Sequence, residues 1–249
     1  MGKFDGRVAI VTGGAGTIGA AYCKGFAAEG AAVVVADMAD TAPLVAELQA
    51  SGYSAIGVSV DISDKASTEA MAQAAMDEYG RIDVLVNNAA FFKAVTRGPF
   101  EDISVEEWDL TMAVNVRGPW LCSRAVLPAM KDQKHGRIIN ISSNVVWKGV
   151  PGFLQYTTSK SALVGFTRGM AREVGEHGIT VNNVAPDFIP DDYLRAHQPG
   201  NEDAVNAARA IKRTSVPEDM VGTVLYLSSD DAAFVTGQAI LVNGGAFMY

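Results

Sequence analysis

The stretch Val8-Ala9-Ile10-Val11-Thr12-Gly13-Gly14-Ala15-Gly16-Thr17-Ile18-Gly19 decides the fold of this chain. Its apolar start predicts a strand buried on both faces, and helical periodicity follows over residues 18–29. Gly14, Gly16 and Gly19 form a G-x-G-x-x-G pattern between the two. Glycine lets the backbone turn tightly and approach a pyrophosphate, while a helix N-terminus offers free N–H groups and a positive dipole end. The stretch therefore predicts a dinucleotide phosphate site, with an ordinary strand–helix turn as the alternative.

Short β-branched runs alternate with helical stretches along the rest of the chain. Continuous apolar strands indicate a parallel sheet covered on both faces, and the alternation indicates βαβ units. We therefore predict one α/β domain over residues 1–249, a doubly wound Rossmann sheet with helices on both faces. The further strands are expected at residues 32–36, 55–60, 82–86, 137–141, 179–184 and 239–242. The further helices are expected at residues 42–50, 65–79, 105–130, interrupted or tilted near Gly118-Pro119, and 153–177.

One segment, residues 187–215, lacks a clear pattern. It contains Pro190, Pro199 and Gly200 among charged residues. Within a compact domain, a stretch of this kind is usually a functional lid or a disordered loop. We expect it to form a lid over the substrate.

The composition excludes several classes of protein. Apolar residues make up 49% of the 249 residues and charged residues 19%, a balance that supplies a large core and argues against disorder. The formal net charge of −8 disfavours nucleic-acid binding, which needs clustered Lys and Arg. No signal-peptide region or membrane-length apolar run is visible, so a cytoplasmic protein without a membrane partner is expected. Cys23 and Cys122 fall in helix-like stretches and are expected to be buried, reduced thiols.

Asp37 closes the second expected strand, some ~20 residues after the glycines. A carboxylate there can accept hydrogen bonds from an adenosine ribose diol and would repel the 2′-phosphate of NADP. No Lys or Arg follows within Met38-Ala39-Asp40-Thr41, so a phosphate clamp is missing. The pattern favours NAD as the cofactor, with a solvated aspartate at a strand end as the alternative.

A second group of polar residues follows the fifth expected strand. Tyr156 and Lys160 stand at i and i+4, so on a helix both project to one face, a turn apart. Ser142 and Ser143 close the strand just before them. Open α/β sheets bind ligands outside the carboxyl ends of their strands, so these groups are expected to meet a nicotinamide. Each of them alone is uninformative, because most Y-x-x-x-K patterns are solvated helix faces.

Together these motifs resemble the short-chain dehydrogenase/reductase family, over nearly the whole chain. In that family the catalytic serine stands thirteen positions before the tyrosine, which selects Ser143 over Ser142. The matching motifs are, in chain order, the Thr12-Gly13 turn, Asp61, Asn87-Asn88-Ala89-Ala90, Asn115, Ser143, Tyr156 with Lys160, Val181-Asn182-Asn183-Val184-Ala185-Pro186, Gly237-Gln238 and Asn243-Gly244-Gly245.

The resemblance implies a role for each catalytic residue. Tyr156 would be the general acid/base, because a nearby Lys160 ammonium favours the tyrosinate over the unperturbed pKa of about 10. Lys160 would also hydrogen-bond the nicotinamide ribose. Ser143 would hold the substrate oxygen, and Asn115 would anchor a water in a proton relay to Lys160. The expected cofactor-binding residues are Gly13, Gly16, Thr17, Ile18, Gly19, Asp37, Met38, Asp61, Ile62, Asn88, Ala89, Ala90, Tyr156, Lys160, Pro186 and Ile189.

The sequence also leads to expectations about metal binding and quaternary structure: no metal and a homotetramer. His135, His177 and His197 are scattered and match no ligand spacing, so no metal is expected. The resemblance implies a homotetramer, and the apolar ending Ala246-Phe247-Met248-Tyr249 suits a subunit interface.

The chain departs from the family pattern at five positions. Thr17 stands at a usual glycine, which gives a pattern similar to that of the longer epimerase-type members, although the chain is too short for their substrate domain. Ala90 and Asp187 also replace glycines, Asp191 stands where a Thr often touches the cofactor amide, and Asn243 replaces an aspartate. Asp187 and Asp191 bear on cofactor geometry and lid closure.

Aromatic residues gather in the segments expected around the substrate. Residues 144–155 normally form one pocket wall, and Phe91 and Phe92 follow the fourth strand near the same rim. Because ligand pockets are largely apolar and aromatic, this supply predicts a bulky apolar or aryl substrate. Packing of the lid or of a subunit interface is one alternative; binding of a polar or anionic group by Lys148, Arg195 or Gln155 is another. The predicted pocket residues are Ser143, Trp147, Phe153, Tyr156, Phe188 and Tyr193.

Three functions are consistent with these observations. The first is an NAD-dependent alcohol dehydrogenase that interconverts a secondary alcohol and a ketone, with Tyr156 as the general acid/base. The second is a biosynthetic ketone reductase, as of acyl-carrier substrates, which ordinarily prefers NADP and a basic docking patch; Asp37 and the net charge argue against both features. The third is a dinucleotide-sensing scaffold, which would have no reason to keep Tyr156, Lys160, Ser143 and Asn115 together.

Overall fold

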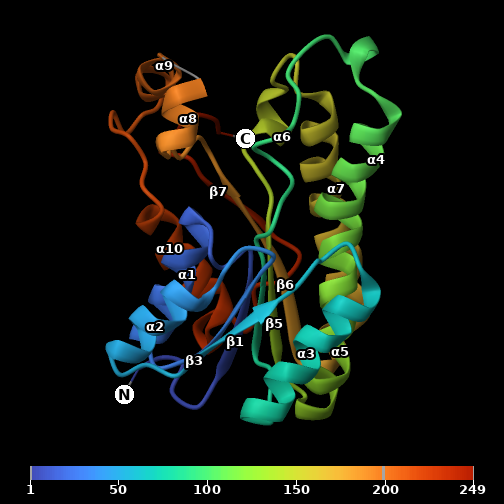
Figure 1. The fold of residues 1–249 in the computed structure, drawn as a ribbon, viewed down its shortest axis with the longest axis vertical. Coiled ribbons are helices and arrows are strands. Elements are labelled where there is room, and N and C mark those ends of the chain that lie inside the picture. Colours follow the sequence, from blue (N-terminus) through green and yellow to red (C-terminus); the bar gives the residue numbers. More distant parts are fainter. Residues whose placement is uncertain (1, 198–199, 249) are drawn as a thin grey trace.

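A seven-stranded parallel sheet forms the centre of the molecule (Figure 1). The computed structural model describes residues 2–197 and 200–248. The strand order is β3-β2-β1-β4-β5-β6-β7, and every neighbouring pair is parallel. This is the doubly wound sheet that the sequence predicts. The strands are β1 Val8–Thr12, β2 Ala32–Asp37, β3 Ala55–Ser59, β4 Val84–Asn87, β5 Gly136–Ile141, β6 Ile179–Pro186 and β7 Ala239–Val242.

The strand order reverses direction between β1 and β4. From β1 the chain moves outward through β2 to β3, then returns and continues from β4 to β7 on the other side. All residues of β1 and β4 are buried, as expected for strands covered on both faces. The crevice outside the carboxyl ends of such a pair is the usual ligand site of open α/β sheets.

Helices cover both faces of the sheet (Figure 1). On one face, Tyr22, Phe26 and Leu227 are central to the buried core, and Phe4 meets Phe26 edge-on with ring centroids 5.1 Å apart. On the other face, the core is built around Met71 and Met130. The first face carries α1 Thr17–Ala28, α2 Ala42–Ala50 and α10 Glu218–Ser228. The second face carries α3 Lys65–Tyr79, α5 Gly118–Gln133 and α7 Leu154–Val174.

The long helix expected over residues 105–130 is present, but its irregularity lies before Gly118. Helix α4 Val105–Met112 runs into a π-helical turn, Ala113–Arg117, and this turn leads directly into α5. Pro119 falls in the first turn of α5, where a missing N–H costs little. The wide turn instead carries the buried Asn115, in keeping with the tendency of such turns to occur at functional sites.

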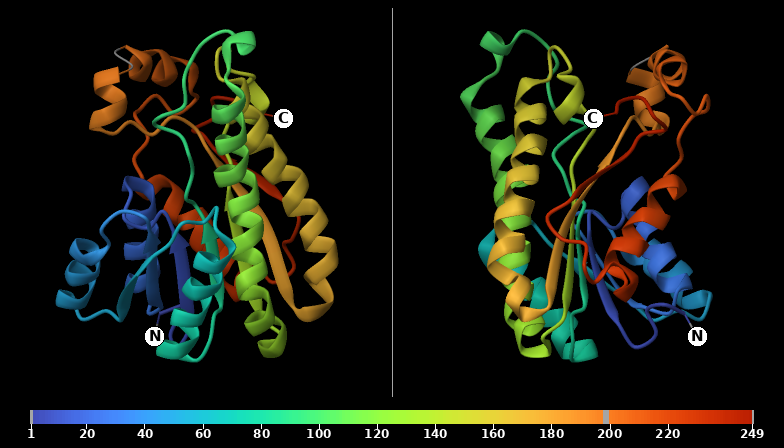
Figure 2. Two further views of the ribbon diagram at one scale, coloured as in Figure 1. Left: turned by 45° about the vertical axis from the view of Figure 1, so that its right-hand side comes forward. Right: turned by 180° about the vertical axis from the view of Figure 1, so that it is seen from behind.

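The segment predicted as an unpatterned lid contains two short helices. It forms α8 Asp192–His197 and α9 Asn201–Ala208, while Gln198 and Pro199 lie outside the described residues. These short helices rise beyond the carboxyl ends of the strands, opposite the upper ends of α4 and α7 (Figure 2). Arg209 is buried behind them and donates hydrogen bonds to the carbonyl oxygens of Phe188, at 2.7 Å, and Arg213, at 3.0 Å. One buried cation thus organises a segment whose sequence lacks periodicity.

A charged cluster lies at the opposite, amino end of the strands. The carboxylate of Asp83 is fully buried and accepts hydrogen bonds from the Val8 N–H at 2.9 Å, Arg7 at 3.1 Å and Arg81 at 2.7 Å. The His135 ring lies 3.4 Å away. Burial by itself raises the pKa of Asp83, but hydrogen bonds from His135, Arg81, Val8 and Arg7 outweigh burial and hold the pKa well below its usual range.

We predict that Asp83→Asn lowers the free energy of unfolding at neutral pH by roughly 1.5–3 kcal/mol, because it removes the buried anion to which the partly exposed Arg7 and Arg81 donate hydrogen bonds. The folded pKa is depressed, so the stabilisation is present above the unfolded pKa of about 3.9 and is lost as pH falls through the folded value. Urea unfolding should therefore show a smaller difference between wild type and variant at acid pH than at neutral pH.

The control for this measurement is Asp231→Asn, which breaks an exposed ion pair with Lys3. It should change stability little at either pH, since exposed pairs contribute little. An Asp83→Asn difference that is the same at both pH values would contradict the assignment.

Candidate active site

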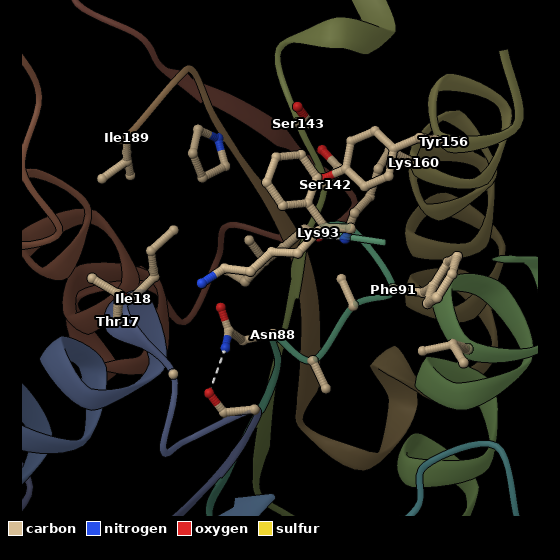
Figure 3. A pocket seen from close by; sticks show the side chains of 18 of the residues that line it. Thr17, Ile18, Asn88, Phe91, Lys93, Ser142, Ser143, Tyr156, Lys160 and Ile189 are labelled. Atoms are coloured by element: carbon tan, nitrogen blue, oxygen red, sulfur yellow. Dashed lines mark hydrogen bonds between the residues drawn. The ribbon is translucent and has the colours of Figure 1, made fainter. Parts of the chain in front are cut away.

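A cavity of about 820 Å³ opens at the carboxyl ends of the strands, under α8 and α9. Leu194 of α8, and Asn201 and Val205 of α9, form part of its lining. Figure 3 shows Thr17 and Ile18 at one side of the cavity and Ser143, Tyr156 and Lys160 at the other. All of the expected cofactor-binding residues line this one cavity.

The glycine turn fits a pyrophosphate. Gly13 has φ +64°, and a Cβ added there would lie 2.9 Å from the Cα of Ala89, so only glycine suits the position. Gly19 packs directly against the carbonyl oxygen of Gly13, which leaves no room for a side chain. Helix α1 begins at Thr17 with Gly16 as N-cap, and no side chain caps its N-terminus. The first N–H groups of α1 are thus available to an anion in the cavity.

Two carboxylates stand at the adenosine end. Asp37 accepts hydrogen bonds from the N–H groups of Ala15 and Ala39, each at 3.0 Å. Asp61 accepts from the N–H and hydroxyl of Ser63, at 2.8 and 2.7 Å. Of the described residues that line the cavity, none within 13–19, 37–38 or 60–63 is cationic. This end therefore suits a ribose diol better than a further phosphate.

Thr12 joins the glycine turn to the end of β4. Its hydroxyl accepts hydrogen bonds from the N–H groups of Asn88 and Ala89, at 3.1 and 3.2 Å, and donates to the carbonyl of Val86. The amide of Asn88 donates to the carbonyl oxygens of Thr12, at 2.9 Å, and Gly13, at 3.2 Å. Asn88 therefore fixes the shape of the turn, while Ala89 and Ala90 also line the cavity.

Tyr156 and Lys160 project from one face of α7 into the cavity, as the i, i+4 spacing predicts (Figure 3). The Lys160 ammonium lies 5.7 Å from the centre of the Tyr156 ring and donates a hydrogen bond to the carbonyl of Ile141 at 2.9 Å. Both residues are buried. Lys160 is thus held between α7 and the end of β5, within electrostatic reach of the Tyr156 ring.

The two serines after β5 differ in their partners. Ser142 donates a hydrogen bond of 2.6 Å to the side-chain oxygen of Asn183 on β6. Ser143 lies close to Tyr156 in the cavity (Figure 3), and its interaction with the tyrosine lowers the pKa of Tyr156. Ser142 is thus engaged by β6, whereas Ser143 lies beside the tyrosine.

Burial sets the protonation of the pair on α7. It raises the pKa of Tyr156 well above its usual value, although the Ser143 hydrogen bond and the charge of Arg97 lower that pKa in part. Burial also lowers the pKa of Lys160 to about 8. Without a bound cofactor the site therefore keeps Tyr156 protonated, the form that can donate a proton.

Asn115 lies behind the cavity wall. Its side chain accepts a hydrogen bond from the N–H of Phe91 at 2.7 Å and donates to the Phe91 carbonyl at 3.1 Å. It also donates to Ser159 on α7 at 3.0 Å. Asn115 thus holds the loop after β4 against α7. Its role in a proton relay to Lys160 stays a prediction.

Aromatic rings line the end of the cavity beside Tyr156. Phe153 stacks on Tyr156, with centroids 4.6 Å apart and planes inclined by 25°, and Phe92 packs on the same tyrosine at 5.2 Å. Phe153 and Phe188 line the cavity, as expected. Trp147 and Tyr193, also predicted as pocket residues, are not among the lining residues. Trp147 lies on the short helix α6 Val145–Lys148, and Tyr193 stacks on His197, at 4.1 Å between centroids, on the lid.

The structure also shows where the three residues lie that the sequence offered for binding a polar or anionic group. Gln155 is buried outside the cavity and donates to the carbonyl of Thr96 at 2.9 Å. Arg195 pairs with Glu202 at 3.1 Å on the lid, away from the lining. Lys148 does line the cavity, but it pairs with Asp187 at 2.9 Å.

Asp187 and Asp191, which differ from the family pattern, both form ion pairs. Asp187 is held between Lys148 and the buried Arg209, at 2.9 and 3.3 Å. Asp191 pairs with Lys93 at 2.7 Å and accepts a hydrogen bond from the N–H of Leu194 in α8. Both carboxylates thus attach the lid to the rest of the protein. Burial opposes ionisation in each case, but these cations and hydrogen bonds keep both pKa values below the ordinary value.

Sequence reasoning missed Lys93 and Arg97, which also line the cavity. Both lie on the loop after β4, where no motif or periodicity marks a functional position. The only available signal was that this loop follows β4, one of the two strands between which the strand order reverses.

A doubly wound sheet, an open helix N-terminus behind a glycine turn, and a Ser-Tyr-Lys group in one cavity define a nicotinamide-dependent oxidoreductase. The chain belongs to the short-chain dehydrogenase/reductase family: a family model described as enoyl-(acyl carrier protein) reductase matches residues 13–246.

Relatives of known function cover the whole fold. The chain is 38% identical to the (2S)-[(R)-hydroxy(phenyl)methyl]succinyl-CoA dehydrogenase subunit BbsD of Thauera aromatica, over 98% of this chain and 97% of that protein. It is 35% identical to the 3-oxoacyl-[acyl-carrier-protein] reductase FabG of Escherichia coli, over 99% of both. A crystal structure of a blue fluorescent protein from a metagenomic library, in complex with NADPH, superposes with a TM-score of 0.90 at 36% identity, covering 99% of this chain and 100% of that one.

We predict a pH dependence for ketone reduction. With Tyr156 as the expected proton donor and a protonated Lys160 as the expected group that restores its proton, kcat/KM for a ketone should be level below pH 8. It should fall above pH 8, as Lys160 loses its proton at about 8. The Lys160→Arg variant keeps its charge, so any remaining activity should decline only at higher pH. Identical alkaline limbs in the two proteins would exclude Lys160 as the titrating group.

Proposed function

We propose that this protein reduces a ketone to a secondary alcohol, and catalyses the reverse oxidation, with Tyr156 as general acid/base. The observation that carries the proposal is the meeting of Ser143, Tyr156 and Lys160 at the aromatic end of a cavity whose other end is the glycine turn. A nicotinamide dinucleotide, when bound, supplies or accepts the hydride. The protein then has to place the carbonyl and move one proton.

Each of the three residues has a distinct part in that task. In reduction, Ser143 and Tyr156 donate hydrogen bonds to the carbonyl oxygen, and the Tyr156 hydroxyl gives up its proton as the alkoxide forms. The Lys160 charge stabilises the resulting tyrosinate, and would bind the ribose next to it. The expected cofactor residues, from Gly13 to Ile189, would hold the dinucleotide along the cavity.

Relatives favour the ketone reductase over the alcohol dehydrogenase as the physiological direction. FabG of Escherichia coli is a 3-oxoacyl-[acyl-carrier-protein] reductase, and the family model is also that of a reductase. We therefore prefer the reductive direction of the second hypothesis from the sequence, the biosynthetic ketone reductase, over the alcohol dehydrogenase. A dehydrogenase such as BbsD shows that the same fold also serves the oxidative direction.

For the cofactor we propose NAD rather than NADP, on the basis of Asp37. Its carboxylate is fixed on the Ala15 N–H beside the glycine turn, and no cation joins it among the described residues at that end of the cavity. A 2′-phosphate bound there would face Asp37 and Asp61 without a positive partner. The solved relative, by contrast, was crystallised with NADPH, which makes this preference a specific feature to test.

The function predicts preferential reduction of aryl ketones. With NADH, kcat/KM for acetophenone should exceed that for butanone by about tenfold or more, because the phenyl ring adds apolar contact with Phe92, Phe153 and Phe188. Tyr156→Phe should lower kcat by roughly 10²–10⁴-fold while its affinity for NADH stays close to that of wild type.

The matched control is Tyr226→Phe, an exposed tyrosine on α10, which should behave as wild type. A Tyr156→Phe enzyme that retains more than about a tenth of the wild-type rate would contradict the proton-transfer role. Equal rates with acetophenone and butanone would contradict the aromatic pocket.

The cofactor assignment predicts the effect of neutralising Asp37. In wild type, kcat/KM with NADH should exceed that with NADPH. Asp37→Asn should reduce this ratio by roughly ten- to a hundredfold, the range expected for a charge-assisted hydrogen bond. Asp40→Asn removes an exposed charge three positions along and should leave the ratio unchanged. Wild-type use of NADPH as efficient as that of NADH would contradict the assignment.

We further propose a cytoplasmic homotetramer. Leu110 on α4 and Trp120 on α5 are large apolar residues with 45% and 46% exposure on one face of the subunit, and Phe166 of α7 lies beside them in a shallow hollow. Such a patch suits an interface between copies. In the part of the chain that the structure describes, no helix is both long and apolar enough to cross a membrane.

A further inference from the structure

Arg97 differs from the other cations that line the cavity. Lys93 pairs with Asp191 at 2.7 Å, and Lys148 pairs with Asp187 at 2.9 Å. Lys160 is engaged with the carbonyl of Ile141 and with its part in proton transfer. Arg97, within residues 2–197 and 200–248, has no carboxylate at ion-pair distance. Arg97 is therefore a cation of the cavity lining that has neither a carboxylate partner among the described residues nor a part in proton transfer.

The guanidinium of Arg97 is held close to the reacting residues. Its Cζ lies 4.0 Å from the centre of the Phe153 ring, and the same ring stacks on Tyr156. The charge of Arg97 acts on the Tyr156 hydroxyl and lowers its pKa. Arg97 and Tyr156 thus contact the same ring and line the same cavity, so one substrate can reach both of them.

The backbone on either side of Arg97 is fixed. The Thr96 N–H donates to Glu107 at 2.9 Å, and the Thr96 carbonyl accepts a hydrogen bond from Gln155, also at 2.9 Å. The Gly98 N–H donates to the carbonyl of Gly152 at 3.2 Å. The loop that carries Arg97 is thus tied to α4 and to the start of α7 before any ligand binds, which reduces the entropy lost when a ligand binds.

The chemistry of this position favours a carboxylate. A guanidinium is planar, presents paired N–H donors, and binds carboxylates in a two-pronged geometry that an ammonium cannot match. Arg97 is exposed overall, but the ring of Phe153 covers part of its guanidinium and lowers its pKa.

We propose that Arg97 binds a carboxylate of the substrate, so that the natural substrates are oxo acids and the corresponding hydroxy acids. This inference rests on the proposed function and specifies its substrate class. The carbonyl lies at Ser143 and Tyr156, the apolar body of the substrate packs on Phe92 and Phe153, and the carboxylate reaches Arg97.

The test compares acids with their own methyl esters. We expect wild type to reduce acetoacetate or levulinate with a higher kcat/KM than the matching methyl ester. Arg97→Met should lower this acid-to-ester ratio by roughly ten- to a hundredfold, the range for losing a hydrogen bond to a charged group. Arg97→Lys, which keeps the charge but not the paired donors, should restore only part of the ratio.

The matched control is Arg124→Met. Arg124 also lies over an aromatic ring, that of Trp120 at 5.8 Å, but on the outer face of α5 away from the cavity. It should leave the acid-to-ester ratio at the wild-type value. An Arg97→Met ratio equal to that of wild type, or an equal fall in the Arg124→Met protein, would overturn the proposal.

A binding measurement separates this inference from the proposed function. Calorimetric titration of the NADH complex with pentanoate, a carboxylate without a ketone, should show binding to wild type that weakens at least about tenfold in Arg97→Met. Failure to reduce any ketone, with this Arg97-dependent binding intact, would refute the proposed function and leave the anion site standing. Reduction of ketones without Arg97-dependent pentanoate binding would refute the anion site alone.

Discussion

The hydrogen bonds that join the end of β1 to the end of β4 through Thr12 are the constraint on which the site depends. Its hydroxyl holds the N–H groups of Asn88 and Ala89, and the Asn88 amide returns to the carbonyls of Thr12 and Gly13. They form at the point where the strand order reverses, so the two ends diverge above them. The same hydrogen bonds shape the glycine turn on one side of the cavity. On the other side they fix the beginning of the loop that carries Arg97.

Burial converts this scaffold into a chemical site. Tyr156 and Lys160 are enclosed between α7, the end of β5 and the ring of Phe153, and this burial raises the pKa of Tyr156 and lowers that of Lys160. The lid contributes to this enclosure through ion pairs: Asp187 and Asp191 attach it to Lys148 and Lys93, and Arg209 binds Asp187 within the lid. Two aspartates that depart from the family pattern therefore act in closing the cavity.

Local sequence signals succeeded where the structure depends on short-range geometry. The strand–glycine–helix stretch, Asp37 at a strand end, and the spacing of Tyr156 and Lys160 all predict positions that the structure places along one cavity. They failed where a side chain's surroundings come from distant segments. Trp147 and Tyr193 are aromatic, as many residues of ligand pockets are, but α6 and the lid place them away from the lining. The sequence did not predict the helices of the lid because the buried Arg209, rather than an apolar stripe, organises the segment.

By itself, the sequence determined the doubly wound sheet, the dinucleotide turn and the Ser-Tyr-Lys group. The patterns that predict them are the spacing of apolar residues, the placement of glycines and the i, i+4 spacing on a helix, and each of these depends only on neighbouring residues or on one strand. Only the tertiary structure decided which charges remain unpaired. Lys93, Lys148 and Arg97 look alike as cations in the sequence, yet Asp191 and Asp187 neutralise the two lysines from across the cavity. Charge pairing depends on distances between segments far apart in the chain, and those distances exist only after folding.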